Sequence, residues 1–456
     1  MDDEIVIPAS VFIIKYHHVQ KSPMDEKRLT LQQKLYALTL CAIVFMMVYN
    51  FTAWYVSKLP EVSSFVFDFE KYIPFISWSI IPYMTSGIFF CVVFFFCQNK
   101  EQLKVLTQRM LFVTIISGIC FLLFPLKFSL SKPEVDNSIL GYSFQFLKVF
   151  DSPFNQAPSL HIAYAFIFWS VFRNVKRGKT FVMFWLILLG ISTLTTYQHH
   201  FIDIITGSIL AHLCFVMFPC RKNDFLYRNF HVANIYFLSG WIIILIAILV
   251  NQFFEKAGLL MLWPGFMTLL IGYHYQKNHI FFLKNKAGNI PWFKKIFYFP
   301  YLLLYQIFWR FFRKNRFPVE VVPRLYISSR PDHKSLKNFK TNKTTLIYDL
   351  SAEMEELSLI KDKKTYHSVP FLDISTFDIE ETQKLVSEIT GHYRHLPSDG
   401  KILIHCTMGF TRSSVIGILV IKNILSLSLT EAITIMKTHN KHAVIPTYLE
   451  DFLKKF

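Results

Sequence analysis

Long apolar runs fill the first two thirds of the chain and are separated by shorter polar segments. Eight of them are long enough, or nearly so, to cross the roughly 30 Å hydrocarbon layer of a bilayer as helices. They span residues 35–57, 75–97, 110–126, 160–175, 180–196, 202–220, 231–251 and 257–275. The pattern predicts an α-helical polytopic membrane domain over residues 35–275, preceded by an N-terminal segment at residues 1–34.

The pattern changes near residue 318. Short runs rich in β-branched residues alternate with helix-like stretches at 378–396 and 428–438, which is typical of a soluble α/β domain. The strand-like runs are 321–329, 344–351, 366–373 and 401–406. We therefore expect a second domain over residues 318–456, which is long enough to form its own core.

A basic and aromatic linker, residues 276–317, joins the two predicted domains. Within it, residues 297–313 are apolar, and basic residues flank them on both sides. Such flanks favour a helix that lies in the membrane interface. A ninth span is the alternative, and it would place the C-terminal domain on the opposite side of the membrane.

The composition agrees with a membrane protein. Hydrophobic residues make up 53% of the chain and charged residues only 17%, compared with about 25% charged residues in ordinary soluble domains. The formal net charge is +17, but the basic residues lie between the apolar runs and form no separate basic region, so we expect no binding to nucleic acid. Six of the seven cysteines lie within or at the ends of apolar runs, which argues against a disulfide scaffold.

The basic residues also predict an orientation. Of the 30 Lys and Arg residues in 1–317, 24 lie in the loops on one side of the eight predicted spans. Because positive loops stay in the cytoplasm, we expect the N-terminus and all residues from 276 onward to be cytoplasmic. Loops 127–159 and 197–201 then face outward.

The most specific motif lies near the C-terminus, between the strand-like run 401–404 and a helix-like run that begins at Ser413. It reads His405, Cys406, Thr407, Met408, Gly409, Phe410, Thr411, Arg412, Ser413. A strand, a tight loop and a helix N-terminus form a site for an anion, because loop N–H groups and the helix dipole both supply positive potential. Arg412 can bind two phosphate oxygens, and the same field favours the thiolate form of Cys406, a nucleophile.

This motif resembles the signature loop of the cysteine-based dual-specificity and tyrosine phosphatases, and the resemblance covers residues 318–456. It implies a phosphocysteine intermediate on Cys406 and a phosphate bound by loop residues 407–411. It also implies that Ser413 assists breakdown of the intermediate and that His405 shapes the loop. The matching general acid is Asp373, and Asp378 is the alternative. Because residues 407–411 contain no lysine, a monophosphate ester is expected, either a phosphoprotein or a singly phosphorylated lipid.

Two histidine motifs lie where predicted outward loops meet predicted spans. The first ends at His161, and the second runs from His199 to Asp203. Ionisable side chains at membrane depth indicate function, and residues four apart share one helix face. Asp203 can therefore orient His199 as a nucleophile while His161 supplies a proton. His200 with Asp203 is the alternative pair.

These motifs resemble the type 2 phosphatidic acid phosphatase (PAP2) superfamily over roughly residues 75–220. The resemblance implies a phosphohistidine mechanism and a phosphate site that includes Ser159. Two departures concern the basic residues: Thr193 follows Ser192 where the family has Arg, and the first family motif is reduced to Lys127 with Lys132. Relatives that resemble sphingomyelin and inositol phosphorylceramide synthases also lack this arginine, and they transfer a phosphorylated headgroup to an alcohol.

The whole chain resembles bacterial fusions of these two modules, which implies a bacterial inner membrane. We expect a bifunctional membrane phosphatase without a metal or cofactor, acting on a phosphorylated lipid, a phosphoprotein or both. Two alternatives stay open: a headgroup phosphotransferase with an auxiliary phosphatase domain, and a non-enzymatic scaffold with an inactive phosphatase fold.

Overall fold

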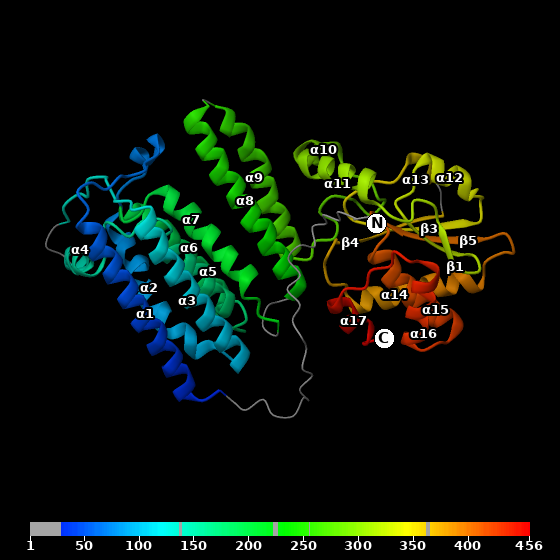
Figure 1. Ribbon diagram of the computed structural model, residues 1–456, viewed down its shortest axis with the longest axis horizontal. Coiled ribbons are helices and arrows are strands. Elements are labelled where there is room, and N and C mark those ends of the chain that lie inside the picture. The colour runs from blue at the N-terminus through cyan, green and yellow to red at the C-terminus, as the bar shows by residue number, and fades with distance from the viewer. Residues whose placement is uncertain (1–28, 136–138, 222–226, 255, 362–364) are drawn as a thin grey trace, which may run out of the picture.

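The computed structural model describes residues 29–135, 139–221, 227–254, 256–361 and 365–456. Most of the predicted N-terminal segment 1–34 therefore lies outside the described residues. The chain forms a helical unit and an α/β unit, with helices α8 and α9 standing between them (Figure 1). The two-part organisation follows the change from membrane-like to strand-like patterning along the sequence.

The helical unit consists of apolar α-helices and short 3₁₀ turns. They are α1 (Leu31–Ser57), η1 (Asp68–Tyr72), η2 (Ser77–Ser79), α2 (Ile80–Val92), η3 (Val93–Phe96), α3 (Lys100–Leu123), α4 (Ile139–Phe150), α5 (Leu160–Phe172), α6 (Lys179–Thr195), α7 (Phe201–Met217), α8 (Tyr227–Phe253) and α9 (Ala257–Gln276). Within the described residues, five helical segments are long and apolar enough to cross a membrane: α1, Ser77–Phe96, α3, α8 and α9. The shorter apolar helices α5, α6 and α7 coincide with three further predicted runs, and the total of eight spans stays a prediction.

Glycines allow two close approaches that shape the helical unit. A Cβ at Gly207 in α7 would lie 2.7 Å from the carbonyl oxygen of Ser159, so only glycine lets α7 meet the start of α5. In the α8–α9 hairpin, a Cβ at Gly240 or Gly265 would lie 2.7 Å from a side-chain carbon of the partner helix. Small residues permit such close helix packing in a membrane, where lipid is as apolar as the helix surface.

The α/β unit is built on a five-stranded mixed sheet in the order β1-β2-β5-β3-β4. The strands are β1 (Val319–Val322), β2 (Leu325–Ser329), β3 (Thr345–Ser351), β4 (Tyr366–Phe371) and β5 (Lys401–Cys406). β1 and β2 are antiparallel, whereas β2, β5, β3 and β4 are mutually parallel. The run 321–329 thus forms parts of two strands, because the chain reverses at Pro323 and Arg324, which has a positive φ of 68°.

Helices cover both faces of this sheet. They are α12 (His333–Phe339), α13 (Ser358–Lys361), α14 (Ile379–Arg394), α15 (Arg412–Leu425), α16 (Leu429–His439) and α17 (Thr447–Leu453). Because successive strand residues point to opposite faces, Ile402 and Ile404 of β5 pack in the core beneath α14 to α17. Leu403 between them packs against α12 and α13.

The linker packs against the α/β unit. It contains the short helix α10 (Trp292–Phe297) and α11 (Phe299–Phe312), which lie beside the sheet domain in Figure 1. With 14 residues, α11 is about 21 Å long, too short for a full span, and this favours the interfacial alternative. The linker also sends Lys284 into the domain, where its Nζ lies 2.6 Å from Asp349 Oδ2 and both side chains are fully buried.

We predict that Lys284→Met lowers the free energy of unfolding of the α/β unit by about 3–5 kcal/mol, because Asp349 would be left buried without its cation. Urea denaturation of the full chain in detergent measures the change. The exposed Lys286 supplies the control, since Lys286→Met should change stability by less than about 0.5 kcal/mol. Equal effects of the two substitutions would show that the buried pair has no special role.

Candidate active sites

The loop from Cys406 to Arg412 joins the end of β5 to the start of α15, as the motif predicts. The carbonyl oxygens of this loop accept hydrogen bonds from residues that surround the loop. Backbone N–H groups of Arg330, Lys314 and Val444 donate to the carbonyls of Thr407, Met408 and Phe410 at 3.1–3.2 Å, and the side-chain amide of Asn315 donates to that of Gly409. Since the C=O and N–H groups of a trans peptide point in opposite directions, the N–H groups of residues 408–411 face inward.

Cys406 lies at the centre of this ring of amides. Its Sγ accepts a hydrogen bond from the backbone N–H of Gly409 at 3.3 Å and lies 3.5 Å from Ser413 Oγ. Gly409 has a φ of +79°, and a Cβ there would lie 2.7 Å from the backbone nitrogen of Ser329, so glycine is required twice over. The ring, the sulfur and the helix N-terminus together can hold a phosphoryl group.

Arg412 is buried with a carboxylate partner that the sequence did not reveal. One guanidinium nitrogen lies 2.9 and 3.0 Å from the two carboxylate oxygens of Glu353 and donates to the carbonyl of Phe371 at 2.8 Å. The other terminal nitrogen lies 3.3 Å from Asp373 Oδ1. The hydroxyl of Thr407 also donates to Glu353, at 2.8 Å. Glu353 therefore orients both the arginine and the loop.

The two candidate general acids occupy different environments. Asp373 lies beside Arg412 in the loop after β4, with its side chain 24% exposed. Asp378 is exposed and caps α14, where its carboxylate accepts a hydrogen bond from the backbone N–H of Glu381 at 2.9 Å. The structure brings Asp373, and not Asp378, to the arginine of the motif.

His405 lies behind the loop and is fully buried. Its ring nitrogens are 3.9 and 3.8 Å from carboxylate oxygens of Asp349 and Glu356, too far for hydrogen bonds. Burial lowers the pKa of His405 to about 4, and the nearby charge of Lys284 acts in the same direction while Asp349 opposes it. The ring is therefore neutral and adds no charge behind the loop.

In the helical unit, His161, His199 and Asp203 meet where α5 and α7 begin. Nδ1 of His199 lies 3.2 Å from Asp203 Oδ2, and Nε2 of His199 lies 3.4 Å from Nδ1 of His161. An ionised Asp203 only accepts hydrogen bonds, so Nδ1 of His199 carries the proton and Nε2 keeps its lone pair. This is the tautomer that a nucleophilic imidazole needs.

His200 is engaged elsewhere. Its Nδ1 lies 2.8 Å from Glu70 Oε2, and both side chains are 2% exposed. The backbone N–H of Ser129 donates to its Nε2 at 3.2 Å, and the ring of Phe128 stacks on it. Only the backbone N–H of His200 reaches Asp203. Of the two alternative pairs, the structure therefore places the His199 ring, and not the His200 ring, on Asp203.

A second carboxylate, Asp151, lies on the other side of the histidine pair. The hydroxyls of Tyr49 and Tyr83 both donate to it. Tyr83 also stacks on His161 with ring centroids 4.4 Å apart, and Asp151 is close enough to interact electrostatically with His161. The site thus runs from Asp203 through both histidines to Asp151.

The other predicted residues of this site take different positions. Lys132 Nζ donates to Gln198 Oε1 at 2.8 Å, directly beside His199, whereas Lys127 is exposed. Ser159 is fully buried next to His161, and its hydroxyl makes no hydrogen bond within the described residues. Arginines lie at the opposite ends of the helices: Arg109, for example, donates to the carbonyl of Phe218 beyond the end of α7.

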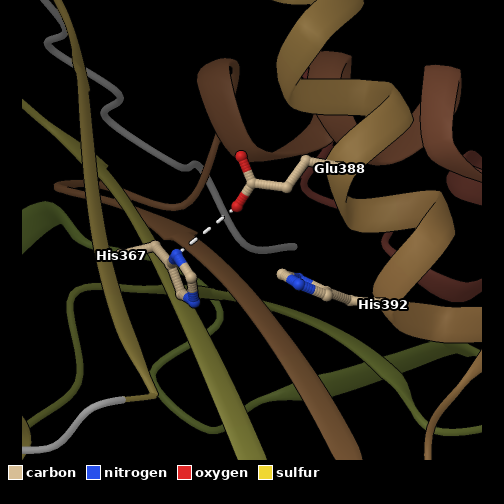
Figure 2. A group of neighbouring side chains, drawn as sticks. All are labelled: His367, Glu388 and His392. Atoms are coloured by element: carbon tan, nitrogen blue, oxygen red, sulfur yellow. Dashed lines mark ion pairs between the residues drawn. The ribbon is translucent and has the colours of Figure 1, made fainter.

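Two groups of side chains in the α/β unit could hold a metal ion. One, Asp349 with Glu356 and His405, is buried and already contains the ammonium group of Lys284. The other joins His367 of β4 to Glu388 and His392 of α14, with ligand atoms all within 4.8 Å of one another. Figure 2 shows these three side chains facing a common point.

The sequence analysis missed Glu353, Asp151, Tyr83 and Glu70. Glu353, Tyr83 and Glu70 contact motif residues more than 50 positions away, whereas Asp151 precedes His161 by ten residues, and none of the four has a spacing that would mark it. The only signal was that Glu70 and Asp151 are acidic residues in segments that also border predicted spans.

Known proteins resemble two parts of this chain. Residues 77–217 match the PAP2 superfamily. No curated protein matches the chain. Among solved structures, Tk-PTP in its active form is 21% identical (TM-score 0.27) and covers 30% of this chain and 94% of its own. Human DUSP28 is 17% identical (TM-score 0.25), covering 30% and 90%, and the human tyrosine phosphatase-like serine/threonine/tyrosine-interacting protein is 14% identical (TM-score 0.27), covering 31% and 95%.

We predict that the neutral His405 makes the α/β unit sensitive to acid. Between pH 6.5 and about 4 the unfolded chain binds a proton at this residue and the folded chain does not, so stability is lost as the pH falls. The wild type should lose about 1.4 kcal/mol per pH unit in this window relative to His405→Asn. Burial also raises the pKa of Glu356 to about 8, but Glu356 is present in both proteins. Urea denaturation across this range tests the difference, and parallel curves would contradict it.

Proposed function

We propose that the chain is an integral membrane protein that hydrolyses a phosphomonoester at Cys406. At His199 it binds a phosphorylated lipid and cleaves its phosphate ester. The observation that carries the first part is the geometry around Cys406: a sulfur among inward-facing amides, with Arg412 clamped by Glu353 and Asp373 within 3.3 Å of the guanidinium. The match of residues 77–217 to the PAP2 superfamily supports the second part.

The reaction at Cys406 proceeds in two steps. The thiolate attacks phosphorus, the P–O ester bond breaks, and protonated Asp373 gives its proton to the leaving oxygen. Water then attacks the phosphocysteine, the P–S bond breaks, and Asp373 takes a proton from the water as inorganic phosphate forms. Amides 408–411 and Arg412 stabilise the charge on the phosphoryl oxygens in both steps, and Ser413 lies close enough to donate to the departing sulfur.

The two sites belong to opposite membrane surfaces in this proposal. His199 precedes α7, whose 17 residues extend about 26 Å. The chain that leaves α7 enters α8, and the first turn of α8 contacts the loop of Asp373. This supports a site at each end of the helices, and the positive-inside distribution favours the cytoplasmic side of a bacterial inner membrane for Cys406.

A second candidate, phosphotransfer to an alcohol, is favoured for the membrane site by one observation. Lys132 reaches Gln198, the residue before His199, while the carboxylate of Asp151 lies close enough to His161 to interact with it electrostatically. A site that is poor in positive charge and has a carboxylate behind the imidazole is suited to removing a proton from an acceptor hydroxyl. The same arrangement binds free phosphate weakly.

We predict that Cys406→Ser abolishes hydrolysis of p-nitrophenyl phosphate by the full chain in detergent. Asp373→Asn should lower kcat by about 10²–10⁴-fold on an alkyl phosphate, because an alkoxide leaves poorly without a proton. Asp378→Asn serves as the matched control and should leave kcat within about threefold, since it affects only a helix cap of roughly 1 kcal/mol. A larger loss from Asp378→Asn than from Asp373→Asn would reverse the assignment.

We predict that the membrane site transfers a phosphorylated headgroup when an acceptor alcohol is present. The Cys406→Ser protein, incubated with headgroup-labelled phospholipid and inositol or glycerol, should form a new labelled phosphodiester, and His199→Ala should lower its yield at least about 10³-fold because the nucleophile is lost. Release of the labelled phosphorylated headgroup into water, with no new phosphodiester, would assign hydrolysis to this site instead.

A further inference from the structure

The α8–α9 hairpin lies outside the PAP2 match, yet it contacts the loop that carries Asp373. Asn229, in the first turn of α8, is fully buried, and its Oδ1 accepts hydrogen bonds from the backbone N–H and the hydroxyl of Thr376 at 3.0 and 3.2 Å. Its amide N–H donates to Asn278 Oδ1, just beyond α9, at 2.9 Å. The Asn229 side chain thus joins the start of α8 and the residues after α9 to the loop that carries Asp373, called the acid loop below.

Two further contacts hold the same loop. Arg228 Nε donates to the carbonyl of Ile374 at 2.9 Å, directly after Asp373, and its guanidinium lies 4.6 Å from the ring centroid of Tyr448. Leu372, directly before Asp373, is 1% exposed and belongs to an apolar cluster shared with the hairpin. The hairpin members of that cluster are Val232, Ala233, Met267, Ile271 and Tyr275.

A layer of tyrosines lies between the hairpin and the acid. The hydroxyl of Tyr305 donates to Asp373 Oδ2 at 3.4 Å. Burial above all raises the pKa of Tyr305 well above its usual value, and the charge of Asp373 acts in the same direction, so this hydroxyl stays a donor. Tyr301 packs on Tyr305, and Tyr236 packs on Tyr275, with ring centroids 4.8 and 5.0 Å apart. Tyrosine favours the boundary between hydrocarbon and water.

These residues surround the place where the leaving group must lie. Asp373 protonates the oxygen of the leaving group, so that oxygen is within hydrogen-bond reach of its carboxyl group during the reaction. The residues next to that carboxyl group include Tyr305 of α11, Arg412, and Leu372, which precedes Asp373 and packs against the hairpin. The organic part of the substrate therefore meets membrane helices and their tyrosines.

Helix α11 places this surface at headgroup depth. Tyr301 and Trp309 of this helix are buried, whereas six of its large apolar side chains from Leu303 onward are more than 40% exposed. They are Leu303, Leu304, Ile307, Phe308, Phe311 and Phe312. Arg310 and Lys314 are exposed near the end of this helix, where they can meet lipid phosphates, whereas Arg313 and Arg316 both pair with Asp332. An apolar face bordered by cations matches a bilayer with anionic lipids.

We propose that the α8–α9 hairpin and α11 are part of the Cys406 site, and that this site hydrolyses a phosphomonoester lipid held in the same membrane. This rests on the proposed phosphatase activity and adds the substrate class. The hairpin positions the acid loop through Asn229, and the tyrosine layer receives the glycerol part of the lipid. The neutral loop residues Thr407, Met408, Phe410 and Thr411 suit a single phosphate group.

Substrate preference tests the proposal in the full chain carrying His199→Ala, which silences the other site. The protein, reconstituted in phosphatidylcholine vesicles, receives phosphatidic acid, a phosphotyrosyl peptide or p-nitrophenyl phosphate. We expect kcat/KM for phosphatidic acid to exceed that for the peptide at least about tenfold, because only the lipid gains binding energy from the bilayer and the tyrosines. The rate should also follow the mole fraction of phosphatidic acid in the vesicle.

The outcomes separate the two levels of the proposal. Hydrolysis of the peptide in preference to phosphatidic acid, with p-nitrophenyl phosphate still cleaved, overturns the lipid substrate and leaves the phosphatase intact. Failure to cleave any of the three overturns the phosphatase and the lipid assignment together.

The role of the hairpin is tested by Asn229→Ala. If the loop of Asp373 is misplaced, hydrolysis of phosphatidic acid should slow at least about tenfold, because its alkoxide leaving group needs a proton. Hydrolysis of p-nitrophenyl phosphate should slow by less than about threefold, because its phenolate leaves without one. Asn234→Ala is the matched control: Asn234 is buried in the same helix but bonds to His212 and to the carbonyl of Phe230. Equal losses on both substrates, or the same pattern in Asn234→Ala, would contradict a positioning role.

A separate observation points to a metal site at His367, Glu388 and His392. Nδ1 of His367 lies 3.4 Å from Glu388 Oε1 (Figure 2). Zinc bonds of about 2.0–2.1 Å in a tetrahedron separate neighbouring ligand atoms by about 3.3–3.4 Å, which equals the distance between these two atoms, and the ligand atoms of all three residues lie within 4.8 Å of one another. The hydroxyl of the core residue Tyr348 lies 2.6 Å from Nδ1 of His392 and donates to Glu388 at 3.2 Å, so it orients two of the ligands.

We infer that these three side chains bind one Zn²⁺ ion, with the fourth position open to water. Calorimetry with ZnCl₂ on the full-length Cys406→Ser protein, in which the reactive thiol is absent, should show one more tight site than the same protein carrying His392→Ala. Co²⁺ should give the visible absorption of a tetrahedral site in the first protein only. Identical titrations and spectra from the two proteins would rule the site out.

Discussion

The buried contact between Arg412 and Glu353 is the interaction on which the C-terminal site depends. A guanidinium that is 2% exposed requires a full set of acceptors, and Glu353 with the carbonyl of Phe371 supplies them. The contact joins the segment after β3, the end of β4 and the signature loop in one place. Because Asp373 follows β4 by two residues, fixing Phe371 also restricts where the acid can lie. The remaining N–H groups of the Arg412 guanidinium are then left to bind a phosphate group.

The membrane site solves a related problem. Asp203 and Glu70 are both buried among apolar helices, and each is held by one of two adjacent histidines whose rings turn to opposite partners. Tyr49 and Tyr83 do the same for Asp151. Carboxylates at membrane depth are costly without such partners, and Asp203 also orients the imidazole of His199, the proposed nucleophile. The same hydrogen bonds therefore stabilise the buried carboxylates and orient the ring of His199.

Local sequence patterns made the positions of the motif residues predictable. The side chains that contact these motif residues could not be predicted, because no local pattern marks them. Cys406 to Ser413 form one loop between a strand and a helix, and His199 and Asp203 share a helix turn, so residue type and spacing were sufficient. Glu353 and Asp151 carry no such spacing, because tertiary packing alone brings them to Arg412 and His161. The hairpin at Pro323 was missed for a different reason: the residues on both sides of Pro323 and Arg324 are strand-forming, so the run 321–329 was interpreted as one strand, and the positive φ at Arg324 separates it into two.

The contact of Asn229 with Thr376 changes how the two halves of the chain relate. If the α/β unit were simply tethered, its active site would face any direction that the linker allowed. Instead Lys284 enters its core from the linker, Tyr305 reaches its acid, and Asn229 binds its acid loop. These contacts come from three successive segments that border the membrane, so the catalytic face has one orientation relative to the bilayer. A fixed orientation is of no advantage for substrates that diffuse in solution, but it is required for a substrate whose own headgroup is confined to the same plane.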